Sequence, residues 1–339
     1  MTDDTILLAH GSGGRLTHDL IKDVFIQHLG NSLLATQDDA AVWTLSKPGP
    51  DRIALTTDSY VVSPIFFPGG DIGRLAVCGT VNDLAMVGAN PLYLTAGFIL
   101  EEGLPLADLE RVVASMAEAG TEAGVQVIAG DTKVVERGGV DRMFITTAGV
   151  GEVPEGVCIS GANVKPGDVA ILSGSVGLHG MAVMSQREGL RFSFPLHSDC
   201  APLNGLVAGM LNTGQRIHCL RDPTRGGLAT TLNEIACQSS VGIEIQEERI
   251  PVSEGVRAAC ELLGLDPLYV ANEGKLVAFV PAEAEKPVLE AMRRQRYGQE
   301  AAVIGRATTD RPGRVVMRTP FGAHRILDML SGEQLPRIC

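Results

Sequence analysis

The sequence has no run of about 18 apolar residues, the length that a membrane-spanning helix needs, and no Cys-x-x-Cys pair. Its seven cysteines are odd in number and widely spaced. This spacing argues against a disulfide framework or a structural zinc site and favours a cytoplasmic location. Basic residues are also few, because 28 Lys and Arg stand against 40 Asp and Glu, for a net charge of −12. Proteins that bind nucleic acids usually carry a basic surface. We therefore expect neither nucleic acid nor a membrane among the partners.

Two common nucleotide-binding motifs are missing as well. The chain has no Gly-x-x-x-x-Gly-Lys-Ser/Thr and no Gly-x-Gly-x-x-Gly. If the protein binds ATP, Mg²⁺ and backbone N–H groups must hold the phosphates. The glycine loop, defined here as Gly11, Ser12, Gly13 and Gly14, offers such N–H groups, although a disordered terminus would have the same composition.

The pattern of apolar residues predicts a mixed α/β fold in two domains, since 339 residues exceed one typical domain of about 150. Helices over 71–87, 105–124 and 227–239 alternate with strands over 91–100, 143–150 and 169–172. The segment 151–167 is rich in Gly and Pro and marks the boundary. We expect an N-terminal domain over 1–155, a C-terminal α/β domain over 156–330 and a mobile tail over 331–339.

Four short acidic clusters lie beside or within apolar runs, and they contain Asp38 and Asp39, Asp58, Asp83, and Asp131. We expect three of them to open or close strands, and Asp83 to lie in an otherwise apolar helix. A buried carboxylate is costly unless it is paired or binds a metal. Carboxylates gathered from several elements suit Mg²⁺ beside a nucleotide, and ordinary turns and helix caps are the alternative.

Three other segments could carry chemistry. Lys133 follows Asp131 and could be an acid–base group or part of a structural ion pair. The segment Asp222 to Gly227 opens an apolar helix and could bind an anion or serve as a cap and turn. Cys339 stands at the end of the sequence, where it could be an accidental exposed thiol or the carrier of a covalently bound substrate on a swinging arm.

The sequence resembles the HypE family, the carbamoyl dehydratases of [NiFe]-hydrogenase maturation, nearly from end to end. The segments that carry this resemblance include His10-Gly11-Ser12-Gly13-Gly14, Thr57-Asp58-Ser59-Tyr60, Asn82-Asp83, Gly130-Asp131-Thr132-Lys133, Asn272-Glu273-Gly274-Lys275 and Pro336-Arg337-Ile338-Cys339. The acidic clusters alone point only to the wider superfamily of aminoimidazole ribonucleotide synthetase and selenophosphate synthetase. The terminal Pro-Arg-Ile-Cys is the specific element.

The resemblance implies a two-domain aminoimidazole-ribonucleotide-synthetase-like fold, a homodimer, and ATP with Mg²⁺ between the domains. It implies a carbamoyltransferase, HypF, that loads Cys339, and a HypC–HypD scaffold that receives the cyano group. ATP-dependent dehydration would convert the carbamoyl thioester to a thiocyanate. The site residues that it implies are the catalytic Cys339, Lys133 and Glu273; the metal-binding Asp39, Asp58, Asp83 and Asp131; the ATP-binding Gly11, Ser12, Gly13, Gly14, Asp38, Asn82 and Thr132; and a substrate pocket of Asp222, Thr224, Arg225, Gly226 and Gly227.

Two other functions fit parts of the pattern. Selenophosphate synthetase resembles this chain at the aspartates, but it uses a reactive Cys or selenocysteine in the N-terminal glycine loop, and no Cys precedes Cys78 here. A non-catalytic nucleotide-binding scaffold would bind partners through the tail. ATP consumption that requires a carbamoylated tail would distinguish an enzyme from such a scaffold.

Overall fold

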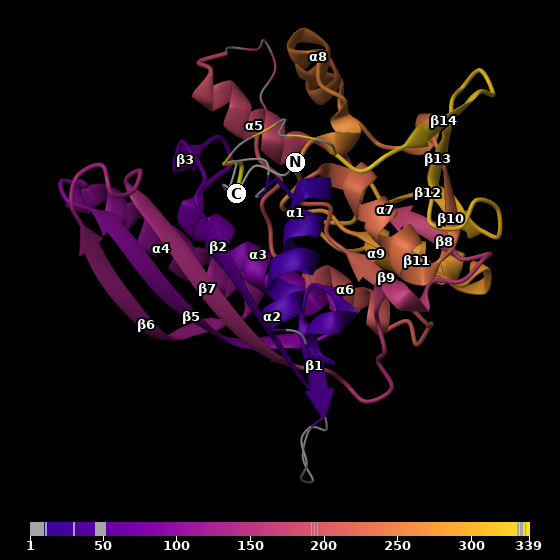
Figure 1. Cartoon of the computed structure of the whole chain (residues 1–339), viewed down its shortest axis with the longest axis horizontal. Coiled ribbons are helices and arrows are strands. Elements are labelled where there is room, and N and C mark those ends of the chain that lie inside the picture. The colour runs from indigo at the N-terminus through magenta and orange to yellow at the C-terminus, as the bar shows by residue number, and fades with distance from the viewer. Residues whose placement is uncertain are drawn as a thin grey trace.

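A computed structural model of the chain describes residues 10, 12–29, 31–44, 52–190, 192, 194, 196–330, 332, 335 and 337–339. It has two α/β halves, each built around its own sheet, with the C-terminus between them (Figure 1). Gly11 of the glycine loop lies outside the described residues. The mixed α/β fold expected from the sequence is confirmed.

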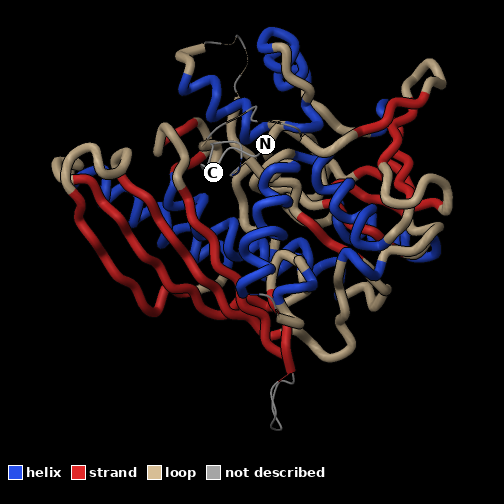
Figure 2. The backbone as a smooth tube through the Cα atoms, viewed as in Figure 1, coloured by secondary structure: helices blue, strands red, loops and turns tan. Residues whose placement is uncertain are grey.

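The N-terminal half contains a five-stranded sheet in the order β1-β2-β7-β5-β6, visible as the red strands on the left of Figure 2. Its strands are β1 (Ala41–Thr44), β2 (Arg52–Tyr60), β5 (Asn90–Glu101), β6 (Gln126–Val135) and β7 (Met143–Glu152). All pairings are antiparallel except β5 with β6. Helices α3 (Ile72–Met86) and α4 (Leu106–Ala123) pack together against this sheet, whereas β3 (Phe66–Phe67) and β4 (Gly70–Asp71) form a separate hairpin.

Helix α3 is the central element of this half. Asp71 caps it by accepting hydrogen bonds from the backbone N–H groups of Gly73 and Arg74. Most of its residues are buried, so the helix is apolar on all sides rather than amphipathic. Gly79 lies directly under the hydroxyl of Tyr60, where a Cβ atom would collide with it. The helix therefore brings its polar residues Asn82 and Asp83 into the interior of the protein.

The C-terminal half contains a seven-stranded sheet in the order β14-β13-β10-β12-β8-β11-β9. Its strands are β8 (Val169–Leu172), β9 (Cys219–Arg221), β10 (Gly242–Gln246), β11 (Val277–Val280), β12 (Ala302–Thr308), β13 (Val315–Arg318) and β14 (His324–Leu327). Its helices are α5 (Leu178–Arg187), α6 (Asn204–Leu211), α7 (Gly227–Ser239), α8 (Glu254–Leu263) and α9 (Glu285–Arg293). Two separate apolar clusters on this sheet make the core of this half.

An N-terminal helical segment crosses the front of the molecule in Figure 1, as α1 (Arg15–Leu20), η2 (Ile21–Ile26) and α2 (Gln27–Leu29). Short turns of 3₁₀-helix fill several connections, at η3 (Leu34–Thr36), η4 (Gly161–Asn163), η5 (Glu247–Arg249), η6 (Pro267–Tyr269) and η7 (Ala282–Ala284). Two expectations for the acidic clusters were wrong. Asp58 lies inside β2 and Asp131 inside β6, because both strands continue through polar residues; β2 has one exposed face, whereas nearly all residues of β6 are exposed.

Candidate active site

Five acidic residues from distant parts of the sequence lie near one another between the two halves, and we call them the carboxylate cluster. They are Asp39, Asp58, Asp83, Asp222 and Glu273. Burial and the neighbouring charges of Asp222, Asp58 and Asp39 raise the pKa of Asp83 well above its usual range. The Thr56 hydroxyl donates to Asp83 Oδ2 at 2.8 Å, and this bond opposes the upward shift. The neighbouring carboxylates are thus close enough to add to the effect of burial in disfavouring the charged form of Asp83.

Asp39 and Asp222 lie near each other and beside Arg221, which pairs with Asp39 and directly precedes Asp222 in the sequence. Burial raises the pKa of Asp39 to about 6 although the guanidinium of Arg221 is paired with it. Burial and the charge of Asp39 raise the pKa of Asp222 to about 8. Arg221 lies at the end of β9 directly before Asp222, so one short segment supplies both a cation and an anion to the junction.

Glu273 is the most enclosed member of the cluster, with only 3% of its surface exposed. Its backbone is fixed because its N–H donates to Asp199 Oδ1 at 3.2 Å and its carbonyl accepts from Ala201 N at 3.3 Å. Its side-chain Oε1 is buried without a hydrogen-bond partner. Burial and the charges of Asp222, Asp58 and Asp199 raise its pKa well above the usual range. A raised pKa makes the ionised carboxylate a stronger base, so a rigidly held Glu273 with a free oxygen suits a general base once it has lost its proton.

The C-terminal residues Arg337–Cys339, called the tail segment here, lie against this cluster. Val61 N and Ser63 N, directly after β2, each donate at 3.2 Å, to Cys339 O and Arg337 O respectively. The tail segment thus runs beside residues 61–63 in the opposite direction and accepts two main-chain hydrogen bonds from them. Burial, Glu273 and two aspartates raise the pKa of the half-buried Cys339 thiol, whereas the guanidinium of Arg225 lowers it. In this position the thiol carries its proton.

The glycine loop meets the same region. Gly13 has φ +77° and lies so close to Arg225 that a Cβ atom would come within 2.7 Å of the Arg225 Cβ. A Cβ atom on Gly14 would collide with the Leu330 carbonyl. Ser12 Oγ donates to Gly332 O at 3.3 Å. Glycine at 13 and 14 is therefore what allows the N-terminal loop to approach the segment 222–227 and the start of the tail.

The segment 222–227 forms a compact turn before α7. Gly227 N donates to Thr224 O at 3.0 Å, and both Gly226 and Gly227 have positive φ. The buried Asn272 holds this turn, since its Nδ2 donates to Pro223 O at 2.8 Å. This bond explains how the turn is placed beside Glu273, the next residue in the chain.

Two predicted ATP-binding residues hold the halves together in this structure. Asp38 Oδ1 accepts from Ser160 Oγ at 3.0 Å and from Gln238 Nε2 at 3.1 Å. Asn82 Nδ2 donates to Ala201 O at 3.1 Å, and its Oδ1 accepts from Leu203 N at 2.7 Å. Their roles in ATP binding stay predictions.

The predicted residues of β6 lie apart from the carboxylate cluster. Asp131 is paired across β5 with Gly97, and Lys133 with Ile99, so both point from the outer face of the sheet. Asp58 points from the inner face, towards α3. The strand order puts Asp58 and Asp131 three strand spacings apart, about 14 Å. Asp131 and Lys133 form an exposed ion pair, and Thr132 between them is also exposed.

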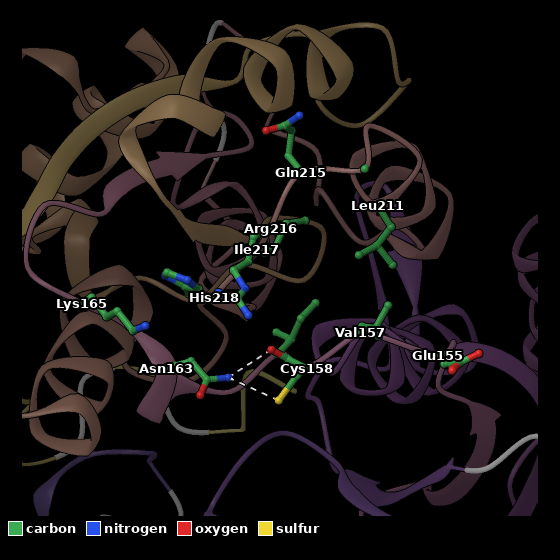
Figure 3. Close-up of a pocket in the computed structure, with 13 residues that line it drawn as sticks. Glu155, Val157, Cys158, Asn163, Lys165, Leu211, Gln215, Arg216, Ile217 and His218 are labelled. Atoms are coloured by element: carbon green, nitrogen blue, oxygen red, sulfur yellow. Dashed lines mark hydrogen bonds between the residues drawn. The ribbon is translucent and has the colours of Figure 1, made fainter.

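No three His, Cys, Asp or Glu side chains converge as metal ligands within the part of the chain that the structure describes. Nor does that part contain a helix of the length and apolar character needed to cross a bilayer. A pocket of about 390 Å³ lies elsewhere, between the segments 155–165 and 211–218 (Figure 3). Cys158, Asn163 and His218 line it, and no member of the carboxylate cluster does.

Sequence reasoning gave little weight to three residues at this junction. Arg221 precedes the polar turn and is 8% exposed, yet only the structure reveals its pairing with Asp39. Tyr60 is buried beside the cluster, with Asp58 and Asp83 raising the pKa of its phenol. His179 contacts the tail segment. In the sequence, the glycines around His179 in Gly177-Leu178-His179-Gly180 were the one local sign that this residue could lie at a site.

Comparison with known proteins defines the class first. Residues 37–153 match the family model of the AIR synthase related protein N-terminal domain, and residues 165–318 match that of the C-terminal domain. The two halves of the structure, with the carboxylate cluster between them, therefore define a two-domain protein of the AIR-synthase-related class.

The chain is 57% identical over 339 residues to the carbamoyl dehydratase HypE of Azotobacter vinelandii, covering 100% of this chain and 98% of that protein. It is 46% identical to the Escherichia coli K12 carbamoyl dehydratase HypE over 338 residues, or 99% of this chain and 100% of the relative. Within the AIR-synthase-related class, this chain therefore belongs to the HypE family of carbamoyl dehydratases.

Two solved structures resemble this one over most of their length. A HypE–HypF complex contains a chain with a TM-score of 0.87 and 51% identity, covering 92% of this chain and 99% of that one. HypE in complex with ATP has a TM-score of 0.83 and 54% identity, covering 99% and 100%. The family expected from the sequence is thus confirmed.

Proposed function

We propose that this protein uses ATP to dehydrate a carbamoyl group carried on the sulfur of Cys339, leaving a thiocyanate that supplies the cyanide ligands of a [NiFe]-hydrogenase. The observation that carries the proposal is the placement of the Cys339 thiol beside Glu273, Asp58, Asp222 and Arg225, whose charges all act on its pKa. Family membership supports the reaction, and the ATP complex of a relative supports the co-substrate.

The reaction balances with residues of this site. The carboxamide oxygen of Cys339–S–C(=O)NH₂ takes the γ-phosphoryl group of ATP, which turns a poor leaving group into a good one and releases ADP. The nitrogen loses two protons as the C≡N bond forms and phosphate departs. Glu273, with its unpartnered Oε1, accepts the first of these protons, and the departing phosphate takes the second. Arg225 compensates negative charge beside the sulfur. The docked tail segment limits the access of water to the thioester.

Mg²⁺ fits the donor set of the carboxylate cluster. The cluster offers only oxygen donors, and burial together with the neighbouring carboxylates raises the pKa values of Asp83 and Asp222. We propose that Asp39, Asp58 and Asp83 hold Mg²⁺ with the phosphates of ATP, and that Asp131 contributes from β6 of a second copy of the chain, because it lies on the outer face of its own sheet. Bound Mg²⁺ supplies charge neutralisation of the transferring phosphoryl group. The glycine loop, Asp38, Asn82 and Thr132 are the proposed ATP contacts.

We also propose a homodimer that packs through the outer face and edge of the N-terminal sheet. Large apolar side chains are exposed there, namely Leu55, Tyr93, Ile99, Val127, Ile128 and Val134. Exposed apolar groups of this size are typical of an interaction surface. Packing of a second copy on this face would also cover the exposed Asp131–Lys133 pair.

The partners proposed are those of the family. A HypF-type carbamoyltransferase loads Cys339, as the HypE–HypF complex of a relative suggests, and a HypC–HypD scaffold accepts the cyano group. A cytoplasmic location agrees with the cysteine content. We further propose a domain division into 1–155, 156–330 and the tail 331–339, whose last residues, expected to be mobile, are docked in this structure.

Intact mass spectrometry tests the function. The protein is incubated with HypF, carbamoyl phosphate and ATP. We expect a mass gain of one carbamoyl group, followed by loss of one water only when ATP is present. Cys339→Ala should give neither change. Stable carbamoylation without water loss at saturating ATP would contradict the dehydratase function and indicate a carrier that only binds nucleotide.

A further inference from the structure

His179 in the first turn of α5 is completely buried and contacts the main chain of the tail segment. Its Nε2 lies 2.8 Å from the carbonyl oxygen of Ile338, and its Nδ1 lies 2.8 Å from Ser198 Oγ. The ring of Phe67 meets the imidazole edge-on at a centroid distance of 5.3 Å. The ring is thus held on three sides, with one nitrogen directed at the tail.

The partners determine where the ring carries its proton. A carbonyl oxygen can only accept, so Nε2 must donate to Ile338 O. Nδ1 must then accept from the Ser198 hydroxyl, whose oxygen in turn accepts from Cys200 N at 3.1 Å. Burial lowers the pKa of His179, which favours this neutral form. Every polar atom in the chain from Cys200 N to Ile338 O therefore has a defined donor or acceptor role.

Helix α5 contacts the tail at two further places. Arg187 in its last turn donates to Arg337 O at 2.8 Å and also to Ser63 O at 2.8 Å. Gly180 faces both the core and the tail, since a Cβ atom there would come within 2.4 Å of Val270 Cγ1 and within 3.2 Å of Leu335 Cδ1. The contacts from His179 and Arg187 are to backbone carbonyls, so these two residues of α5 bind the main chain of the tail.

We propose that His179 is the positioning residue that holds the tail segment in its docked place, through a hydrogen bond from Nε2 to Ile338 O that Ser198 orients. It touches no reacting atom. The proposal rests on the proposed function only in taking Cys339 as the carrier. The test measures the position of the tail and not turnover, so the positioning role of His179 and the proposed dehydratase function can fail independently.

The test is the rate of Cys339 alkylation by iodoacetamide in the full chain without ATP, followed by peptide mass spectrometry. The exposed Cys158 and Cys237 serve as internal references. A docked thiol reacts slowly because it is half-buried and protonated. We expect His179→Leu to raise the Cys339 rate about tenfold, the change that about 1.4 kcal/mol in the docking equilibrium produces. His179→Gln, which keeps a donor near the Nε2 position, should restore most of the protection.

Two controls separate positioning from general destabilisation. His218→Gln changes another buried histidine, whose Nδ1 lies 2.7 Å from Asp168 Oδ2 instead of contacting the tail. It should leave Cys339 protected even where the melting temperature falls. Ser198→Ala keeps the imidazole but removes its orienting partner, and should raise the rate by a smaller factor. Equal Cys339 rates in wild type and His179→Leu would overturn the proposal, as would equal exposure in His218→Gln and His179→Leu at matched stability.

Discussion

The hydroxyl of Thr56 in β2 donates a 2.8 Å hydrogen bond to Oδ2 of Asp83 in α3, across the boundary between sheet and helix. Despite this bond, burial and the charges of Asp222, Asp58 and Asp39 leave the pKa of Asp83 well above its usual range. The site therefore holds more negative charge than its own cations neutralise, and this excess makes the stability of the ligand-free protein depend on pH.

We expect the free energy of unfolding of the ligand-free protein to fall as pH rises from about 4 to about 8. The pKa of Asp39 is raised to about 6 and that of Asp222 to about 8. The native state therefore keeps protons that the unfolded state releases above its ordinary pKa of about 4. Each such group lowers stability by at most about 1.4 kcal/mol per pH unit in this window. Thermal melts in EDTA from pH 5 to pH 8.5 measure the slope, and Asp222→Asn should flatten it. A stability that rises with pH would contradict the charge crowding.

Asp83→Asn and Asp131→Asn should change the melting temperature of the ligand-free protein differently, but should weaken the stabilisation by Mg–ATP alike. At pH 8, Asp83→Asn removes a crowded charge and should raise the ligand-free melting temperature by about 2–5 °C. Asp131→Asn should change it by about 1 °C or less, because that side chain is 69% exposed. Both should lose most of the stabilisation that Mg–ATP gives the wild type. Full Mg–ATP stabilisation in either variant would remove that residue from the site.

Glu273→Gln should be loaded with carbamoyl at the normal rate but should dehydrate it about 10²–10⁴-fold more slowly, the usual contribution of a general base. Loading requires the tail thiol and HypF, whereas loss of water requires the buried Oε1. Single-turnover dehydration of preloaded protein at saturating ATP measures the step. A wild-type rate would assign Glu273 a structural role.

Lys133→Ala should leave the melting temperature nearly unchanged, because the Lys133–Asp131 pair is exposed and such pairs contribute about 0–1 kcal/mol. It should slow dehydration, and we expect Lys133 to serve the site of a second chain, since it lies on the outer face of the sheet, remote from Asp58 of its own chain.

Subunit mixing tests this arrangement. Lys133→Ala and Cys339→Ala chains are mixed and allowed to exchange. If Lys133 acts on the partner, one of the two sites in each mixed dimer is intact, and activity should return to about a quarter of the wild-type level. No recovery in demonstrably mixed dimers would place Lys133 in the site of its own chain.

How far the sequence led differs between parts of the site. The buried helix around Asp83 and the turn from Asp222 to Gly227 were predictable, because apolar periodicity and glycine positions are local properties. The course of β6 through Asp131 was not, since an exposed edge strand lacks the alternation that marks a half-buried one. The pairing of Arg221 with Asp39 and of His179 with Ile338 joins residues more than 150 positions apart. No local pattern encodes such contacts.

The main-chain hydrogen bonds between residues 61–63 and the tail segment also determine what can compete for this place. The N–H groups of Val61 and Ser63 could donate equally well to the carbonyl oxygens of any other extended peptide. The covalent attachment gives the chain's own tail an effective concentration of about millimolar. A foreign peptide must approach that concentration to displace it. When the tail segment leaves this place to bind a partner protein, residues 61–63 lose this protection. The time that the tail segment spends undocked therefore determines how long a competing peptide can bind there.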